Sequence, residues 1–166
     1  MHEDPSTTAS EPSSSFAGYG LDERLCGALA ELGWAEPTPI QDRAIPALLE
    51  GRDVVGRART GSGKTAAFGL PALQLALASP RSTSVLVLAP TRELAVQVSD
   101  ALASYAKSTK LRFATLYGGS PYKAQFEALD ARPEIVVGTP GRLIDHLERG
   151  SLDLSALQLL VLDEAD

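Results

Sequence analysis

Short apolar runs alternate with segments of helical character along most of this chain, and this alternation limits the possible folds more than any other feature. Five strands are predicted from the runs at residues 54–56, 85–89, 113–117, 135–138 and 159–162. The segments between them predict helices at about 64–78, 92–106, 121–131 and 141–149. Such an order is typical of an α/β fold with a parallel sheet. The runs are continuously apolar, which indicates that helices cover both faces of the sheet.

Two more helices are predicted ahead of the first strand. Leu21, Leu25, Leu29 and Leu32 recur at helical spacing, so we expect an amphipathic helix that ends near Gly33. A second short helix should run from Gln41 to Leu49. Within the later helix at 64–78, Pro71 is expected to kink or restart the chain, because proline lacks the amide hydrogen that a helix interior needs.

Length and composition limit the class of protein. At 166 residues and 44% hydrophobic content, the chain is long enough for one domain with its own core. Residues 1–15 are rich in Ser, Thr and Pro and contain no Lys or Arg, which predicts a disordered leader. No apolar run approaches the roughly 20 residues of a membrane span, and the N-terminus lacks the order of a signal peptide. We therefore expect a cytoplasmic protein without membrane contact.

Charge and cysteine content exclude further classes. The net charge of −6 argues against a binder that holds nucleic acid by a general basic field, so any such binding must be local. The single cysteine, Cys26, rules out an internal disulfide or a thiolate metal cluster. We assign packing roles to Cys26, Trp34 and Tyr105, and no role to His2 or His146, which lack partners at metal-ligand spacing.

A glycine-rich loop follows the first predicted strand and leads directly into a helix. Its residues are Ala58, Arg59, Thr60, Gly61, Ser62, Gly63, Lys64 and Thr65. Glycines let backbone N–H groups turn inward around phosphates, and a helix N-terminus adds favourable partial charge. In this pattern Lys64 reaches the β and γ phosphates and Thr65 offers a hydroxyl to Mg²⁺. Ala58 stands where the usual pattern has its first glycine, which is tolerable because the small residues are needed nearest the phosphates.

An acidic sequence follows the last predicted strand. Asp163 at the carboxyl end of a buried strand can hold Mg²⁺, usually through water, while Glu164 orients or deprotonates an attacking water. Taken alone, such a cluster is as often a solvated turn. The phosphate loop about a hundred residues upstream favours the catalytic interpretation.

With these two motifs, the chain resembles the first core domain of the DEAD-box family of ATP-dependent RNA helicases from about residue 16 to residue 166. The resemblance implies a RecA-like P-loop domain with a mostly parallel, incomplete sheet flanked by helices. Gly33 and the run from Pro37 to Gln41 resemble the adenine-recognition element of the family, with Phe16 upstream. In the family the glutamine amide pairs with adenine and the aromatic ring packs on the base, so the resemblance places Phe16, Thr38 and Gln41 in the ATP site. Without that context, Gln41 would be a solvent-facing helix residue and Phe16 a hydrophobic staple.

Three other clusters resemble the contacts that the family makes with the RNA backbone. They comprise Pro90, Thr91 and Arg92, then Gly118 and Gly119, then Thr139, Pro140, Gly141 and Arg142. Each suits a phosphate chemically, because Thr91 and Thr139 can cap helices, Pro140 fits a first helical position and the glycines allow close approach. The resemblance implies binding to the backbone with little sequence preference, and local opening of duplexes.

The resemblance also implies partners that these 166 residues do not contain. In the family a second RecA-like domain supplies arginines to the γ phosphate, and Asp166 would contact a Ser-Ala-Thr element that couples hydrolysis to unwinding. The strand leading to that element would lie between the phosphate-loop strand and the Asp163 strand. Its absence predicts a gap within the sheet and a marginally stable fragment. Two alternatives to an RNA helicase stay open: a non-catalytic fragment that binds nucleotide or RNA, and another nucleic-acid-dependent ATPase.

Overall fold

The structure of the chain, a computed structural model, describes residues 15–165. Residues 1–14 of the predicted leader, and Asp166 with its predicted coupling role, lie outside the described residues. One 3₁₀ turn, six helices and four strands follow in the order η1 (Phe16–Tyr19), α1 (Glu23–Glu31), α2 (Pro39–Leu49), α3 (Lys64–Leu77), β1 (Val85–Leu88), α4 (Arg92–Tyr105), β2 (Phe113–Leu116), α5 (Tyr122–Asp130), β3 (Ile135–Gly138), α6 (Pro140–Glu148) and β4 (Leu159–Leu162). No helix within the described residues is long and apolar enough to cross a membrane.

The four strands form one parallel sheet in the order β2-β3-β1-β4. Strand β1 lies between β3 and β4, with Val85 opposite Ile135 on one side and Leu159 on the other. All four strands therefore end at the same edge of the sheet. The predicted α/β class and parallel sheet are confirmed.

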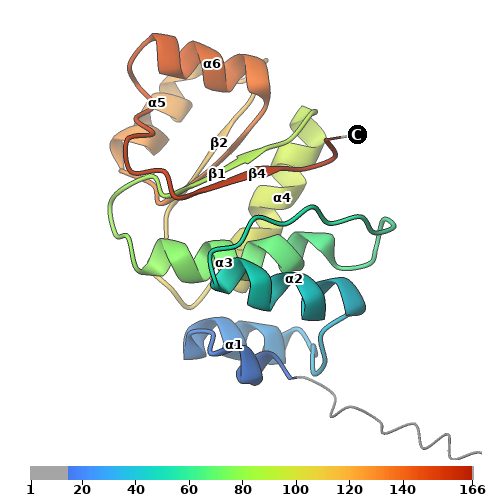
Figure 1. Cartoon of the computed structure of the whole chain (residues 1–166). Helices are drawn as coiled ribbons and strands as arrows, with labels where there is room; N and C mark the ends of the chain where they lie inside the picture. Colours follow the sequence, from blue (N-terminus) through green and yellow to red (C-terminus); the bar gives the residue numbers. More distant parts are fainter. Residues whose placement is uncertain (1–14, 166) are drawn as a thin grey trace, which may run out of the picture.

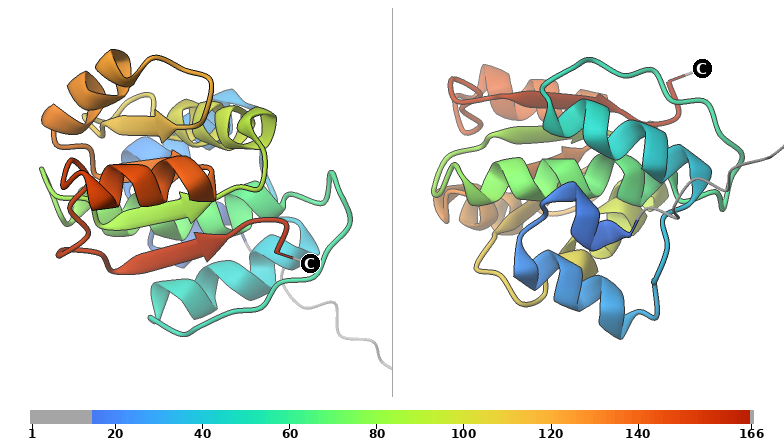
Figure 2. Two further views of the ribbon diagram at one scale, coloured as in Figure 1. Left: turned by 90° about the horizontal axis from the view of Figure 1, so that it is seen from above. Right: turned by 60° about the horizontal axis from the view of Figure 1, so that its bottom comes forward.

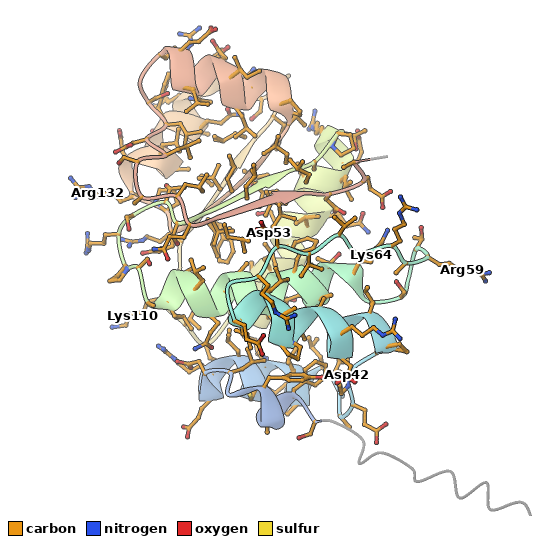
Figure 3. The ribbon with its side chains drawn as sticks, viewed as in Figure 1. Asp42, Asp53, Arg59, Lys64, Lys110 and Arg132 are labelled. Atoms are coloured by element: carbon orange, nitrogen blue, oxygen red, sulfur yellow. The ribbon has the colours of Figure 1, made fainter. Side chains whose placement is uncertain are left out.

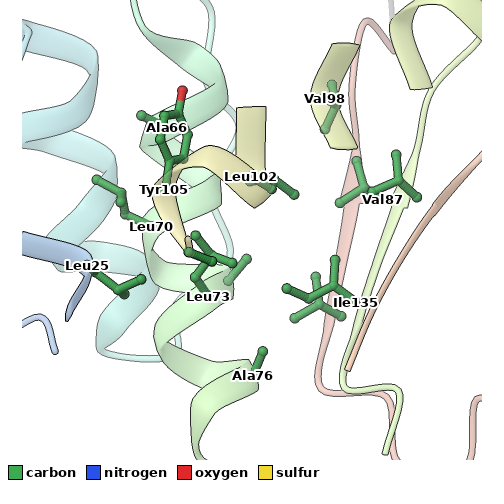
Figure 4. Close-up of a cluster of buried hydrophobic side chains, with 14 of the residues drawn as sticks. Leu25, Ala66, Leu70, Leu73, Ala76, Val87, Val98, Leu102, Tyr105 and Ile135 are labelled. Atoms are coloured by element: carbon green, nitrogen blue, oxygen red, sulfur yellow. The ribbon is translucent and has the colours of Figure 1, made fainter. Parts of the chain in front are cut away.

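Helices cover both faces of the sheet, as Figures 1 and 2 show. On one face, Val85, Val87 and Ile135 pack with the buried residues of α1, α3 and α4 into the larger core cluster, which Figure 4 shows in part. On the other face, Leu86 and Val136 pack with Leu143 of α6 and with α5 in a smaller cluster. Side chains that alternate along one strand thus enter different cores, which explains why the strands are apolar at every position.

The prediction of a strand at residues 54–56 is wrong, and the sheet has four strands instead of five. This segment is extended but unpaired, and Val54 and Val55 are 38% and 91% exposed. It lies on the same side of the molecule as the free edge of β4 (Figure 2). Within residues 15–165 no strand lies between it and β4, so its backbone groups have no ladder to join. The sheet accordingly ends at β4, where Leu160 and Leu162 are 52% and 57% exposed, and has no internal gap.

The helix predictions are correct apart from two details. Helix α3 continues through Pro71 as one helix of 14 residues, so the predicted restart does not occur. Pro71 is buried in the helix face that packs on the core, and this packing compensates for the missing hydrogen bond. In the first helix, Leu21, Leu25 and Leu29 are buried as predicted, but Leu32 is 46% exposed because α1 ends before it.

Candidate nucleotide and RNA site

The two motifs about a hundred residues apart meet at the edge where the strands end. The Nζ atom of Lys64, the first residue of α3, lies 3.3 Å from Oε1 of Glu164, just after β4. Both side chains remain partly exposed, at 28% and 45%. Figure 3 shows Lys64 and Arg59 at this end of the molecule. The phosphate loop and the acidic sequence therefore share one site, although the phosphate loop does not follow a paired strand.

Glycine conformations shape the phosphate loop. Gly61 and Gly63 have φ values of 81° and 87°, a left-handed region that other residues seldom adopt. Gly63 is the residue before α3, so the free N–H groups of the first helical turn face the loop. The Oγ atom of Ser62 is buried without a hydrogen-bond partner in the described structure. A buried hydroxyl of this kind needs an acceptor or donor that only a ligand or water can supply here.

Gln41 joins the adenine-recognition element to the phosphate loop. Its Oε1 accepts from the Thr38 N–H at 3.0 Å, and its Nε2 donates to the Gly63 carbonyl at 3.2 Å. A Cβ atom on residue 63 would lie 2.4 Å from Nε2 of Gln41, so a side chain there would have to displace the Gln41 amide. Gln41 is 2% exposed and is therefore not the solvent-facing residue that position alone would suggest. The Gln41 amide thus makes one hydrogen bond to the protein through each of its two polar atoms.

A cavity of about 310 Å³ lies beside this amide, and its lining consists of Gly33, Trp34, Ala35, Glu36, Thr38, Gln41, Gly61 and Gly63. The Oγ1 atom of Thr38 is buried without a hydrogen-bond partner among the described atoms. The unpartnered hydroxyls of Thr38 and Ser62 both belong to residues beside Gly63, and they fit a ligand that brings polar atoms to this cavity. A nucleotide is such a ligand.

The aromatic residues Phe16 and Trp34 lie in different surroundings. Phe16 is 4% exposed and lies in the larger core cluster, with its ring edge on Tyr19 at 6.3 Å between centroids. Its buried position agrees with the hydrophobic-staple alternative. Trp34 packs against the larger core as expected, with its ring centroid 5.5 Å from that of Tyr105, and it also lines the cavity. Its place between Gly33 and Pro37, inside the adenine-recognition element, was the available signal.

Asp163 and Glu164 occupy different environments. Burial raises the pKa of Asp163, and the neighbouring charge of Glu164 adds to that shift. Glu164 is exposed and has a φ of 51°, which is strained for a residue other than glycine. Within the described residues no three His, Cys, Asp or Glu side chains cluster as a metal site. The donors on hand are the carboxylate of Asp163 and the hydroxyl of Thr65, which suits Mg²⁺, a cation bound by few protein ligands together with phosphate oxygens.

The three clusters expected to contact RNA also lie at this edge, after β1, β2 and β3. Thr91 caps α4 as predicted, because its Oγ1 accepts from the Leu94 N–H at 3.2 Å. The Arg92 guanidinium lies over the Tyr117 ring at 4.9 Å from its centroid. A Cβ on Gly119 would lie 3.9 Å from Nη1 of Arg92, so the first two clusters are neighbours. Pro90, Gly118 and Gly119 are exposed.

Arg142 ties the third cluster to the second. Its Nη1 donates to the Ser120 carbonyl at 3.1 Å and to Oε1 of Gln125 at 3.2 Å, and its guanidinium lies 4.1 Å from the centroid of the Tyr122 ring. Pro140 begins α6 as predicted, with Gly141 exposed after it. Thr139 occupies the cap position, but its side chain makes no capping hydrogen bond, so that detail of the prediction is wrong.

Two residues that the sequence did not single out support Arg142. Gln125, 3% exposed, donates from Nε2 to the Tyr117 carbonyl at 2.9 Å, so its Oε1 must accept from both Arg142 and His146. His146, fully buried, must therefore carry its proton on Nε2, 2.8 Å from that oxygen, and Nδ1 faces Ser151. Burial lowers the pKa of His146, and the nearby charge of Arg142 acts in the same direction. His146 has no partner at metal-ligand spacing along the chain, so nothing in the sequence pointed to its support of Arg142.

A parallel α/β sheet with a phosphate loop, an acidic pair and glycine-containing loops at one edge defines a nucleotide-binding protein of the P-loop class. The DEAD/DEAH box helicase family matches residues 38–166, and the chain belongs to this family. It is 55% identical over 154 residues to the ATP-dependent RNA helicases DeaD of Klebsiella pneumoniae and of Escherichia coli K12. The match covers 92% of this chain and 24% of each relative, so the chain spans about a quarter of their length.

Solved structures agree with the fold. A DEAD box protein from the hyperthermophile Methanococcus jannaschii is 40% identical with a TM-score of 0.85, and the match covers 92% of this chain and 42% of that one. A hypothetical ATP-dependent RNA helicase from Sulfolobus tokodaii is 41% identical with a TM-score of 0.81, over 88% of this chain and 42% of that one. These neighbours confirm the RecA-like domain predicted from the motifs.

Proposed function

We propose that this chain is the ATP-binding part of an ATP-dependent RNA helicase that opens duplexes locally. The observation that carries the proposal is the approach of Lys64 to Glu164 at 3.3 Å, because it brings a phosphate-binding cation beside a carboxylate able to orient water. Membership of the DEAD/DEAH box helicase family supports the same reaction, and the relatives at 55% identity are ATP-dependent RNA helicases. A cytoplasmic location is part of the proposal.

In the proposed nucleotide site, residues 58–65 surround the phosphates and Lys64 pairs with them. Gln41 recognises adenine, Thr38 contributes its unpartnered hydroxyl, and Trp34 lines the space beside the base. Phe16 supports the base only from within the core, since 4% exposure leaves little ring surface to touch it. Mg²⁺, held by Thr65 and Asp163, would neutralise phosphate charge.

In the proposed RNA site, backbone phosphates contact the loops after β1, β2 and β3. The residues are those predicted from the sequence: Pro90, Thr91, Arg92, Gly118, Gly119, Thr139, Pro140, Gly141 and Arg142. The arginines are held by Tyr117 and Tyr122, so their charges reach the edge of the sheet in fixed positions. Contacts of this kind read phosphate and sugar, which favours binding with little sequence preference.

We further propose that the 166 residues alone do not turn over ATP and need a second RecA-like domain, to which Asp166 would couple. Glu164 and Lys64 are 45% and 28% exposed, and a site this open does not exclude bulk water from the phosphates. Residues 16–166 can be tested in a chimera in which they replace the matching segment of Escherichia coli DeaD.

The chimera should hydrolyse ATP with stimulation by RNA and unwind a short RNA duplex, whereas the isolated chain should show neither above background. A Lys64→Ala chimera should lose about 100-fold or more in turnover, and a Lys123→Ala chimera should retain it. Stimulation by DNA but not by RNA would favour another nucleic-acid-dependent ATPase. Turnover by the isolated chain would contradict the need for a second domain.

A further inference from the structure

A basic pocket lies at the edge of the sheet opposite the candidate site, where the strands begin. The cavity measures about 360 Å³, and its lining consists of Arg24, Ala76, Leu77, Pro80, Arg81, Lys110, Leu111, Arg112 and Glu134. Four of these nine residues are cationic and one is anionic. Figure 3 shows Lys110 and Arg132 at this end of the molecule and Lys64 with Arg59 at the other. None of these lining residues takes part in the nucleotide or RNA contacts described above.

One buried carboxylate organises the pocket. Glu134, 2% exposed, accepts from the Arg81 N–H at 2.7 Å, from the Arg112 N–H at 2.9 Å and from the Arg112 guanidinium. Burial opposes its ionisation, but the hydrogen bonds from Arg112 and the amides outweigh that effect and lower the pKa of Glu134. Glu134 thus fixes the backbones of Arg81 and Arg112 on either side of the cavity.

Positive charge remains after these pairings. Arg24 pairs with Asp22 at 2.8 Å, and Arg112 uses only part of its five donors on Glu134. The side chains of Arg81 and Lys110 are exposed and have no hydrogen-bond or ion-pair partner among residues 15–165. The pocket is therefore locally cationic in a chain whose net charge is −6.

Backbone strain places arginines at this end of the molecule. Among the described residues other than glycine, only Arg81, Arg132 and Glu164 have positive φ, at 62°, 55° and 51°. This conformation costs a residue with a Cβ atom about 1 kcal/mol or more, and such residues gather at functional sites. Glu164 belongs to the candidate active site. Glycine would relieve the strain at the other two positions, so each arginine places a cationic side chain there at a cost in backbone strain.

We propose that this basic pocket, formed by Arg81, Lys110 and Arg112, binds phosphate groups of RNA that extends beyond the strand held at the opposite edge. Guanidinium forks match phosphate oxygens, and a flexible lysine adds a point charge. RNA is favoured over other polyanions because, under the proposed function on which this inference rests, it is already bound to the same domain. The two edges of the sheet would then contact separate segments of one RNA.

The site can be located by following backbone amide resonances of the purified chain during titration with a single-stranded RNA of about 20 nucleotides. Shifts at Arg81, Lys110 and Arg112 support the proposal, whereas shifts confined to Thr91, Gly118 and Thr139 overturn it and leave the proposed function intact. Shifts at neither edge overturn both. Inorganic phosphate and oligoglutamate serve as separate probes. Saturable shifts with phosphate but not with RNA assign a small anion instead, and a response to oligoglutamate alone assigns an acidic peptide; either result overturns the proposal.

Arg81→Gly with Lys110→Ala provides the matched functional test. The glycine suits the φ of 62°, so the double variant should keep or raise its urea midpoint while RNA affinity falls several-fold. The dependence of affinity on salt should weaken by about one in slope for each removed charge. Arg43→Ala with Arg52→Ala removes two exposed charges elsewhere and should bind RNA almost as the unchanged chain does. Equal losses in the two double variants would show a general charge effect and overturn the pocket.

Discussion

The phosphate loop and the loops proposed to contact RNA lie at the same edge of the sheet but are held in opposite ways. The phosphate loop follows an unpaired segment and leaves the hydroxyls of Thr38 and Ser62 without partners. The loops after β2 and β3 are joined by Arg142, Gln125 and His146 in a nearly saturated hydrogen-bond network. The loops proposed to contact RNA are therefore held in place by folding, whereas the proposed nucleotide side has polar groups that only a ligand or water can satisfy.

Loss of Lys64 should have the largest effect, because it should weaken ATP binding strongly without changing stability. Lys64→Ala removes a charge-assisted contact to phosphate and should weaken ATP binding about 100-fold, because one such contact contributes roughly 1.5–3 kcal/mol. The urea midpoint should hardly move, since the ion pair with Glu164 is largely solvated. Binding of a fluorescent ATP analogue and urea unfolding measure the two effects, with Lys123→Ala as the control. A large drop in stability would contradict the view that folding does not depend on this side.

Gln125→Leu should lower stability and RNA affinity while leaving ATP affinity almost unchanged. The change leaves the Tyr117 carbonyl, Arg142 and His146 short of a partner in a buried place, so the free energy of unfolding should fall by about 2 kcal/mol. RNA affinity should fall with it, while affinity for ATP stays within about twofold. Gln97→Leu, at an exposed position of α4, should change the free energy of unfolding by less than about 0.5 kcal/mol. Unchanged stability in Gln125→Leu would contradict the view that this hydrogen-bond network holds the loops after β2 and β3.

Substitution of Gly63 tests how tightly the adenine-recognition element is joined to the phosphate loop. In Gly63→Ala the new Cβ would lie 2.4 Å from Gln41 Nε2, in addition to the strain of a positive φ. In Gly150→Ala φ is also positive, at 73°, but no atom lies within 4 Å. We expect both to lose about 1 kcal/mol of stability from strain, and Gly63→Ala alone to lose a further amount together with ATP affinity. Equal losses would mean that Gln41 moves aside freely.

The smallest expected effect is a dependence of stability on pH that comes from His146, behind the loops proposed to contact RNA. Because burial lowers the pKa of His146 below 6.5, the unfolded chain binds a proton more readily than the folded one as the pH falls through 6.5. Stability should therefore decline as the pH falls below 6.5, over an interval above the range in which most carboxylates titrate. His146→Gln should flatten urea midpoints over this interval, and His2→Gln, the change at the other histidine, should leave the slope as it was. A slope that survives His146→Gln would assign the titration elsewhere.

Periodicity predicted the elements well wherever helices or strands bury a continuous apolar surface. Four strands and six helices follow the expected segments within a few residues, since packing of those surfaces is what stabilises them. The segment at 54–56 has the same composition as a strand but no neighbouring strand to pair with, and pairing is a property of the tertiary structure. Composition alone could not reveal its unpaired state.

The candidate site was predictable to a similar degree. The glycines and Lys64 predict the phosphate loop, because the chemistry of such a loop depends on the local spacing of these residues. The cavity beside Trp34 and the support of Arg142 by Gln125 and His146 depend on residues brought together from separate elements. No spacing along the chain encodes such contacts, which explains why the role of His146 could not be predicted.

The order of amino acids was enough to establish the α/β class, the P-loop and the acidic pair, because each depends on local patterns of apolar, glycine and charged residues. Folding alone decided which of these meet: it set Lys64 against Glu164, turned Gln41 inward and buried Phe16 in the core. It also gathered Arg81, Lys110 and Arg112 around Glu134 at the far edge of the sheet. Local motifs can be predicted because they depend on residues close together in the sequence. Contacts between distant segments arise only when the apolar faces of the helices and the sheet pack together.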